Sequence, residues 1–233
     1  MADGLIANSE DVAQDFKKIT GLDVPHLSVI HNPAYDDSIA GMMNMTTRHD
    51  WFEGGSIPII LHVGRLESQK NIPMLMDAFE LVRDAHPCRL ALIGEGSLKP
   101  ELEARAESSR HAKDINFLGH RTNPFPYMKR ASVFVLSSIW EGFGNVLVEA
   151  LATGTPVVAT NCPGGPREIL ADGKYGSLVP IDDVRAMAEA ISSAINTPAA
   201  AEDLLQAAER FRADRIAGQY LEAFGLDRYT ARN

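Results

Sequence analysis

Short apolar runs alternate with longer amphipathic segments through the middle of this chain, and this alternation restricts the fold more than any other feature. Runs of about four to eight apolar residues bounded by turn signals predict buried strands. Because these strands are separated by helical segments, they predict one parallel sheet with right-handed crossovers. The runs are Ile57–Val63, Arg89–Ile93, Ile115–Leu118, Val133–Leu136, Pro156–Thr160 and Ser177–Val179.

The segments between the runs carry helical periodicity. In the first of them, Leu75, Ala78, Phe79 and Val82 would share one face of a helix. The expected helices are Ile72–Ala85, Lys99–Arg110, Pro126–Arg130, Asn145–Thr153, Pro166–Ala171 and Asp182–Ile195, with Gly154 as a C-cap and Asp182 as an N-cap. The sequence therefore predicts a doubly wound α/β domain with six strands and helices on both faces of the sheet.

The two ends of the chain differ from the middle. Residues 1–35 contain a strand at Gly4–Ala7, a helix at Ser9–Ile19 and a strand at Leu27–Ile30, which is too little to fold alone. We expect this segment to be the tail of a truncated N-terminal domain. Residues 36–56 are expected to form a linker, residues 57–197 the main domain, and residues 198–233 a C-terminal segment that is helical over 199–224.

Composition excludes several functional classes. The net charge is −9 in 233 residues, so the average field would repel nucleic acid. No stretch reaches the roughly 20 apolar residues of a membrane span, and residues 1–4 lack the features of a signal peptide. Cys88 and Cys162 have no metal-ligand spacing and are expected to be free thiols in a cytoplasmic protein. The turn Gly94-Glu95-Gly96 is not a dinucleotide fingerprint, and no P-loop occurs.

Charged residues gather where ligands of open parallel sheets bind, beyond the carboxyl ends of the strands. Gly64 and Arg65 follow the run Ile57–Val63, and Lys70 comes five residues after the arginine. An arginine fork and a lysine point charge could clamp a diphosphate. A solvated loop with ordinary surface cations is the alternative.

A glycine-rich turn over residues 141–145 joins the fourth run to its helix. A helix that starts near Gly144 would direct the free N–H groups of residues 144–146 at an anion. Glu141 and Glu149 could accept hydrogen bonds from sugar hydroxyls, although a turn without ligand and a surface glutamate are the plainer interpretations. The turn at Pro163–Glu168 would lead into another helix start, with an ordinary loop as the alternative.

Five motifs, taken in order, resemble those of glycosyltransferase family 4, a group of retaining enzymes with the GT-B fold. They are HVGRLESQKN (His62–Asn71), LIGEGSLKPELE (Leu92–Glu103), INFLGH (Ile115–His120), SSIWEGFGNVLVEALATGTPVVAT (Ser137–Thr160) and CPGGPREIL (Cys162–Leu170). The resemblance covers about residues 57–195 and, weakly, residues 1–35. It implies a Rossmann-like C-terminal domain that binds the sugar donor.

The resemblance also implies roles for the matching residues. Arg65 and Lys70 would neutralise the donor diphosphate and stabilise the leaving group, and Glu141 would bind hexose hydroxyls as the third catalytic residue. Glu149 would bind the ribose, and the Leu118–Arg121 segment would meet the base. The expected donor-binding residues are Gly64, Gly94, Gly96, Leu118, His120, Arg121, Gly142, Phe143, Gly144, Asn145, Val146 and Glu149. The donor would be a UDP- or GDP-linked sugar transferred with retention, and no cofactor or metal is expected.

The resemblance leaves the acceptor side open. The acceptor, a glycan or a lipid-linked glycan, would bind the missing N-terminal domain, and peripheral membrane contact of the full-length protein is compatible with this expectation. His31-Asn32-Pro33 matches the usual start of the linker between the two domains. Catalysis would need the missing wall of the cleft. The alternatives are a nucleotide-sugar-binding module without activity, another GT-B enzyme such as an epimerase or phosphorylase, and a domain that has lost ligand binding.

Overall fold

A computed structural model of the protein describes residues 4–21 and 26–226, and its centre is one six-stranded parallel sheet. The strand order is β5-β4-β3-β6-β7-β8, the doubly wound arrangement that the sequence predicts. The strands are β3 (Ile59–Val63), β4 (Arg89–Ile93), β5 (Ile115–Gly119), β6 (Val133–Leu136), β7 (Val157–Thr160) and β8 (Ser177–Val179).

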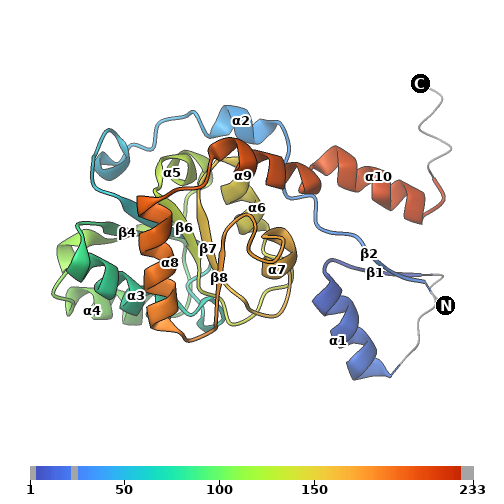
Figure 1. The fold of residues 1–233 in the computed structure, drawn as a ribbon, viewed down its shortest axis with the longest axis horizontal. Helices are drawn as coiled ribbons and strands as arrows, with labels where there is room; N and C mark the ends of the chain where they lie inside the picture. The colour runs from blue at the N-terminus through green and yellow to red at the C-terminus, as the bar shows by residue number, and fades with distance from the viewer. Residues whose placement is uncertain (1–3, 22–25, 227–233) are drawn as a thin grey trace.

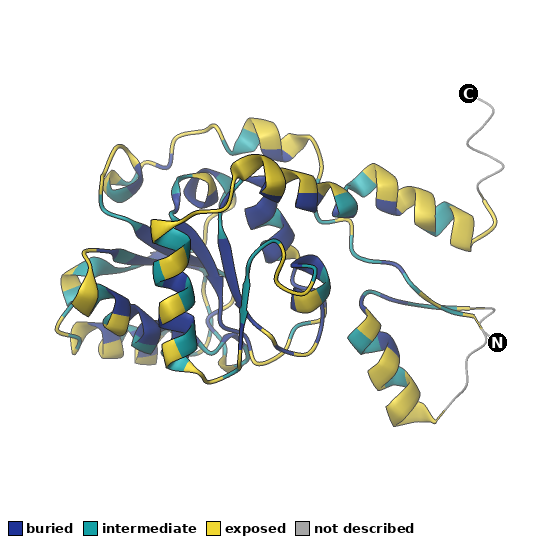
Figure 2. Ribbon diagram, viewed as in Figure 1, coloured by how far each residue is buried: buried dark blue, intermediate teal, exposed yellow. Residues whose placement is uncertain are grey.

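Helices cover both faces of this sheet, and each face has its own apolar core. One core joins Ile60, Leu92 and Val135 of the strands to α3, α4 and α8. The other joins Leu61 and Phe134 to α2, α5, α6 and α9. Figure 2 shows the central strands as continuously buried. The helices are α2 (Ser38–Met42), α3 (Ile72–Ala85), α4 (Lys99–Glu107), α5 (Phe125–Arg130), α6 (Asn145–Ala152), α7 (Pro166–Ile169), α8 (Val184–Asn196) and α9 (Ala201–Ala208).

The first and last described segments project from one side of the main domain (Figure 1). The strands β1 (Leu5–Ala7) and β2 (Leu27–Val29) pair in parallel as a separate two-stranded sheet, joined by α1 (Glu10–Thr20). The last helix, α10 (Ala213–Ala223), runs out beside them and buries only Ile216. Ile19 and Phe224 remain exposed on this projecting part. We therefore expect this projecting part to be stabilised mainly by its contacts with the main domain.

The strand and helix pattern is confirmed, with local corrections. The N-cap of α8 is Asp183, whose side chain accepts from the Ala186 N–H, and not Asp182 as expected. Asp182 has a φ of +62° and accepts a hydrogen bond from Asn71 instead. The helix expected to reach Arg110 ends at Glu107, because the chain tightens into turns before the 3-10 helix at Ala112–Asp114.

The ends also differ from a simple linker and a single helix. Residues 36–56 contain α2 and a 3-10 helix at Asp50–Phe52, which buries Phe52 against Tyr127. The helical stretch over 199–224 breaks at Arg212, where the Ala213 N–H donates to the Tyr35 carbonyl and not along the helix. Residues 1–3 and 227–233 of the predicted end segments lie outside the described residues. In the described part of the chain, no helix has both the length and the apolarity needed to cross a bilayer.

Candidate functional site

The two central strands, β3 and β6, part before they reach their carboxyl ends. Their backbone pairing covers Ile60 with Val133 and Leu61 with Phe134. Beyond that point side chains replace the backbone ladder: His62 Nδ1 lies 3.1 Å from the Val135 carbonyl oxygen. The chains that leave this gap carry the predicted cations on one side and the glycine-rich turn on the other, so the fold brings them to one edge of the sheet.

Lys70 turns inward from the 3-10 helix at Ser68–Lys70. Its Nζ lies 2.5 Å from Oε1 of Glu141, and only 11% and 8% of the two side chains are exposed. The Ser138 hydroxyl donates to the same carboxylate oxygen over 2.6 Å, and Ser137 Oγ donates to the Lys70 carbonyl over 2.7 Å. Lys70 and Glu141 therefore form a buried ion pair that joins the two loops.

Arg65 lies at the solvent side of this pair. It is exposed, and its guanidinium donates to Gln69 Oε1 over 3.3 Å. Gln69 in turn donates to the Trp140 carbonyl over 2.8 Å. One amide side chain thus links the predicted arginine to the loop that ends in Glu141, and leaves the remaining guanidinium donors available to a ligand.

Helix α6 begins beside the ion pair with unsatisfied backbone donors. Gly144 has a φ of +95°, and the first N–H bonded at this end is that of Leu147, which donates to the Gly144 carbonyl. Within the described residues, the N–H groups of Gly144, Asn145 and Val146 have no acceptor. A Cβ at Gly144 would lie 3.9 Å from Glu141 Cγ, so these donors adjoin the pair at the positive end of the helix dipole.

A pocket of about 360 Å³ opens next to Arg65. Its lining includes the predicted residues Gly64, Arg65, Gly94, His120 and Arg121. A larger hollow of about 640 Å³ lies between β1, β2 and the end of α10, but the described residues of its lining include no lysine or arginine. The smaller pocket holds Arg65 and Arg121, and its Gly64 lies beside Lys70. We therefore take this pocket, together with the Lys70–Glu141 pair and the start of α6, as the candidate site.

Several other predicted residues form the frame of the site rather than its surface. Gly94, at a φ of +147°, lets its backbone touch the Gly64 carbonyl, and Gly96 packs as closely on Leu66. The side chains of Leu118 and Phe143 are buried in the apolar core. Only the backbone of these four residues could meet a ligand.

Glu149 lies inside α6, where no described residue donates a hydrogen bond to its carboxylate. Burial raises the pKa of Glu149 above its ordinary value. Glu149 and Glu141 are not bonded to each other, since Glu141 is held by Lys70 and Ser138. Glu149 is thus an unpaired acceptor that a ligand hydroxyl could satisfy.

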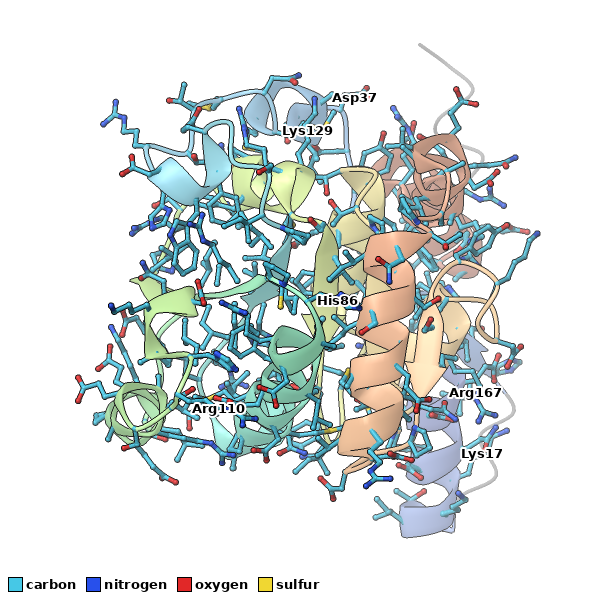
Figure 3. The ribbon with its side chains drawn as sticks, turned by 60° about the vertical axis from the view of Figure 1, so that its left-hand side comes forward. Lys17, Asp37, His86, Arg110, Lys129 and Arg167 are labelled. Carbon is cyan, nitrogen blue, oxygen red and sulfur yellow. The ribbon has the colours of Figure 1, made fainter. Side chains whose placement is uncertain are left out.

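The projecting segment contacts the glycine-rich loops directly. Ser9 Oγ donates to the Gly142 carbonyl, and the Gly164 N–H donates to Asp11. The Glu168 carboxylate accepts from the Glu10 N–H over 2.9 Å and lies 2.8 Å from His31 Nε2. Figure 3 shows Lys17 of α1 and Arg167 of α7 on the same side of the molecule.

The remaining predicted residues of this turn face the same contact. The Asn145 side chain accepts from Asn32 over 2.9 Å, and His31 stacks on Phe143 with ring centroids 5.2 Å apart. Val146 is half-buried against the core. The turn that holds the predicted donor-binding residues is therefore also the docking point of residues 9–11 and 31–32.

Sequence reasoning missed three kinds of contact. Gln69 bonds to the Trp140 carbonyl, which is distant in sequence, and Ser138 bonds to Glu141 only three residues further on. Both residues lie inside the motifs, which give neither of them a role. The turn at Pro163–Glu168 carried the only signal for the docking contact, and it was as compatible with an ordinary loop. The described part of the chain contains no cluster of three or more histidine, cysteine or acidic side chains that could hold a metal ion.

Known proteins resemble this chain in sequence and in structure. It is 36% identical over 134 residues to an N-acetylgalactosaminyltransferase of Campylobacter jejuni that acts on an undecaprenol diphosphate glycan, covering 58% of this chain and 36% of that protein. It is 36% identical over 154 residues to the glycogen synthase of Mycobacterium tuberculosis, covering 65% and 37%. This chain spans about a third of the length of these curated relatives.

Solved structures support the fold. The crystal structure of Anabaena HepE in complex with UDP and glucose matches with a TM-score of 0.79 at 23% identity, over 97% of this chain and 63% of HepE. The family described as glycosyl transferases group 1 matches residues 57–197, which is more than half of the chain. This match contains Arg65, Lys70, Glu141 and the start of α6, and the chain belongs to the group 1 glycosyltransferases.

Proposed function

We propose that this chain is the donor-binding half of a retaining glycosyltransferase of family 4. The parent enzyme transfers a hexose from a nucleoside diphosphate sugar to a glycan or a lipid-linked glycan. One observation carries the proposal: the Lys70–Glu141 pair and the open start of α6 adjoin each other, with Arg65 linked to the same loop. The cations and free amides at this edge of the sheet suit the diphosphate of such a donor, and the carboxylate suits its sugar hydroxyls.

The diphosphate binds between Arg65, Lys70 and the N–H groups of residues 144–146. As the bond from the sugar to the diphosphate breaks, negative charge grows on the leaving phosphate. Cations and oriented amides that face the phosphate once the donor is bound stabilise that charge as the bond breaks. The site needs no metal ion for this neutralisation, because the two side-chain cations and the helix start supply it.

The sugar and the nucleoside meet the remaining residues. Glu141 accepts from hexose hydroxyls, and the unpaired carboxylate of Glu149 accepts from the ribose. The base lies in the pocket beside His120 and Arg121. The UDP named in the HepE structure and the lipid-linked glycan named in the Campylobacter relative support a UDP-linked donor and an acceptor of this class.

A binding module without transferase activity is the second candidate. The observation that favours it is the share of the relatives that the chain spans, about a third of their length. The two candidates share the donor site and differ in chemistry. Release of free sugar from UDP-glucose or UDP-N-acetylglucosamine by the chain would distinguish an active enzyme from a module that only binds.

Calorimetric titration of UDP, GDP and ADP into the chain tests the donor site. We expect one nucleoside diphosphate to bind, and Arg65→Ala to weaken it by about tenfold, because one charge-assisted contact to phosphate is lost. The matched control is Lys129→Ala. Lys129 is exposed, bonds to Asn44, and lies beside α2, away from Arg167 and Lys17 (Figure 3). If no nucleotide binds, or if both variants bind like the wild type, the proposed function is wrong.

A further inference from the structure

His62 has a buried ring nitrogen that no described residue satisfies. Its side chain is fully buried at the end of β3, and Nδ1 lies 3.1 Å from the Val135 carbonyl oxygen. A carbonyl only accepts, so Nδ1 carries the proton. Burial lowers the pKa of His62 to about 4, which keeps the ring neutral near pH 7. Nε2 therefore presents a lone pair, and it is left without a hydrogen-bond donor.

The orphaned lone pair lies close to Lys70. A Cβ at Gly64 would lie 3.0 Å from His62 Nε2 and 3.6 Å from Lys70 Cε. The ring nitrogen and the lysine side chain thus flank the same spot, which stays open because residue 64 is glycine. Buried acceptors without partners are rare in folded proteins, so we expect His62 Nε2 to accept a hydrogen bond in some state of the protein.

Lys70 can supply that donor. Its ammonium carries three N–H groups, and Glu141 is the one acceptor that the described residues offer it. Lys70 and Ser138 both bond to Oε1 of Glu141, so in the proposed function Oε2 accepts the first hexose hydroxyl. A rotation of the carboxylate that brings both oxygens onto the sugar would draw Oε1 away from the ammonium. An ammonium without a carboxylate would then need another buried acceptor to stay in place.

We propose that His62 is a positioning residue for Lys70: its unprotonated Nε2 accepts from the Lys70 ammonium when Glu141 turns to the donor sugar. This inference rests on the proposed function. A neutral acceptor leaves the whole positive charge of Lys70 available to the diphosphate, whereas a carboxylate partner cancels it. The exchange from Glu141 to His62 would thus switch Lys70 from a neutralised to an active cation as the donor binds.

The first experiment needs no nucleotide. Glu141→Gln removes the carboxylate that competes for Lys70, so the ammonium should move onto His62. The ¹⁵N resonance of His62 Nε2 in the labelled chain should shift towards the position of a hydrogen-bonded nitrogen. In Glu141→Gln/Lys70→Met that shift should be absent. The same Nε2 resonance in wild type and Glu141→Gln, or a shift that persists in the double variant, would overturn the proposal.

The second experiment measures UDP binding by calorimetry in two matched variants. His62→Asn keeps an amide donor at the Nδ1 position and loses the acceptor near Lys70. His62→Gln puts an amide oxygen near the Nε2 position. We expect His62→Asn to weaken UDP binding by about tenfold, the effect of one hydrogen bond to a charged group, and His62→Gln to restore most of it.

The decisive comparison repeats the His62→Asn substitution in a chain that already carries Lys70→Met. If His62 acts through Lys70, His62→Asn should have no further effect on UDP binding once the ammonium is gone. If His62→Asn and His62→Gln weaken UDP binding equally, His62 has a merely structural role. The same follows if His62→Asn weakens UDP binding as much in the Lys70→Met chain as in wild type. If wild type binds none of UDP, GDP and ADP, the proposed function fails, and the nucleotide-free experiment still decides between Lys70 and another partner for His62.

Discussion

The ammonium of Lys70 lies 2.5 Å from Oε1 of Glu141, and both side chains are almost completely covered. The two residues are far apart in sequence and come from loops that leave neighbouring central strands. In a covered pair each charge depends on the other, because removal of one leaves its partner without solvent or counterion. The pair therefore couples the stability of the domain to the chemistry of its site.

Replacement of one member of the pair should be more damaging than replacement of both. We expect Lys70→Met to lower the free energy of unfolding by about 3 kcal/mol, because Glu141 is left charged and covered. Lys70→Met/Glu141→Gln should lose clearly less, since no charge remains to be compensated. Urea denaturation of wild type, both single variants and the double variant measures the coupling, and additive losses would contradict it.

Glu149 should make the domain less stable as the pH rises. Burial raises the pKa of Glu149 in the folded state above its ordinary value of 4.5, so the folded state holds its proton more tightly than the unfolded state. Stability is then lost as the pH rises from about 4.5 to the raised pKa, and the loss is constant above it. Glu149→Gln should thus equal wild type at low pH and exceed it at neutral pH in urea denaturation.

If Glu149 accepts from the ribose, bound UDP should reduce or reverse the advantage in unfolding free energy that Glu149→Gln has over wild type at neutral pH. Wild type would gain more stability from UDP than Glu149→Gln, because only the carboxylate is a strong acceptor for hydroxyl groups. Equal pH profiles of the two proteins without nucleotide would show that the carboxylate is solvated. Equal stabilisation by UDP would remove Glu149 from the ribose site.

Gly94 should tolerate no side chain. Its φ of +147° strains any other residue, and a Cβ there would overlap the Gly64 carbonyl. We expect Gly94→Ala to lower the free energy of unfolding by roughly 3 kcal/mol or more. The control is Gly218→Ala in exposed α10, where a Cβ would meet nothing within 4 Å and should stabilise the helix by about 0.5–1 kcal/mol. Thermal unfolding of both variants measures the contrast, and similar effects would contradict the close approach at Gly94.

Glu168 should hold the projecting segment against the main domain. Its carboxylate bonds to the Glu10 N–H and to His31, so Glu168→Ala should speed hydrogen exchange at Glu10 and through α1 by about tenfold, the equivalent of one charge-assisted bond. Exchange in β4 should not change. Asp172→Ala, on the exposed turn that follows the same helix, is the control; equal exchange in the two variants would show that other contacts hold α1.

The sheet was predictable because its information is local. Apolar runs such as Val133–Leu136 lie between segments with helical periodicity, and right-handed crossovers leave few ways to arrange them. The ends of elements depend on single hydrogen bonds. Asp182 and Asp183 are equivalent to a sequence reader, and the partner of Asp182, Asn71, lies in a distant loop. The break at Arg212 likewise depends on the Tyr35 carbonyl.

The candidate site was predictable only as a set of residues at one edge of the sheet. The motifs name Arg65, Lys70 and Glu141, but nothing in their spacing says that Lys70 and Glu141 would be covered and in contact. His62 illustrates the limit most clearly. A lone histidine at a strand end is usually an ordinary packed residue, and only the three-dimensional neighbours of Nε2 give it another meaning.

The early parting of β3 and β6 has a consequence for how such a domain can diversify. Their backbone ladder covers just two residue pairs, and beyond it the two loops are joined by the bond from the Ile139 N–H to the Gln69 carbonyl and by the Lys70–Glu141 pair. Replacing side chains of these loops changes the contacts that they offer a ligand without changing the pairing of the strands. A scaffold of this kind can acquire new specificities by surface substitution alone, while the strands below retain their apolar sequence.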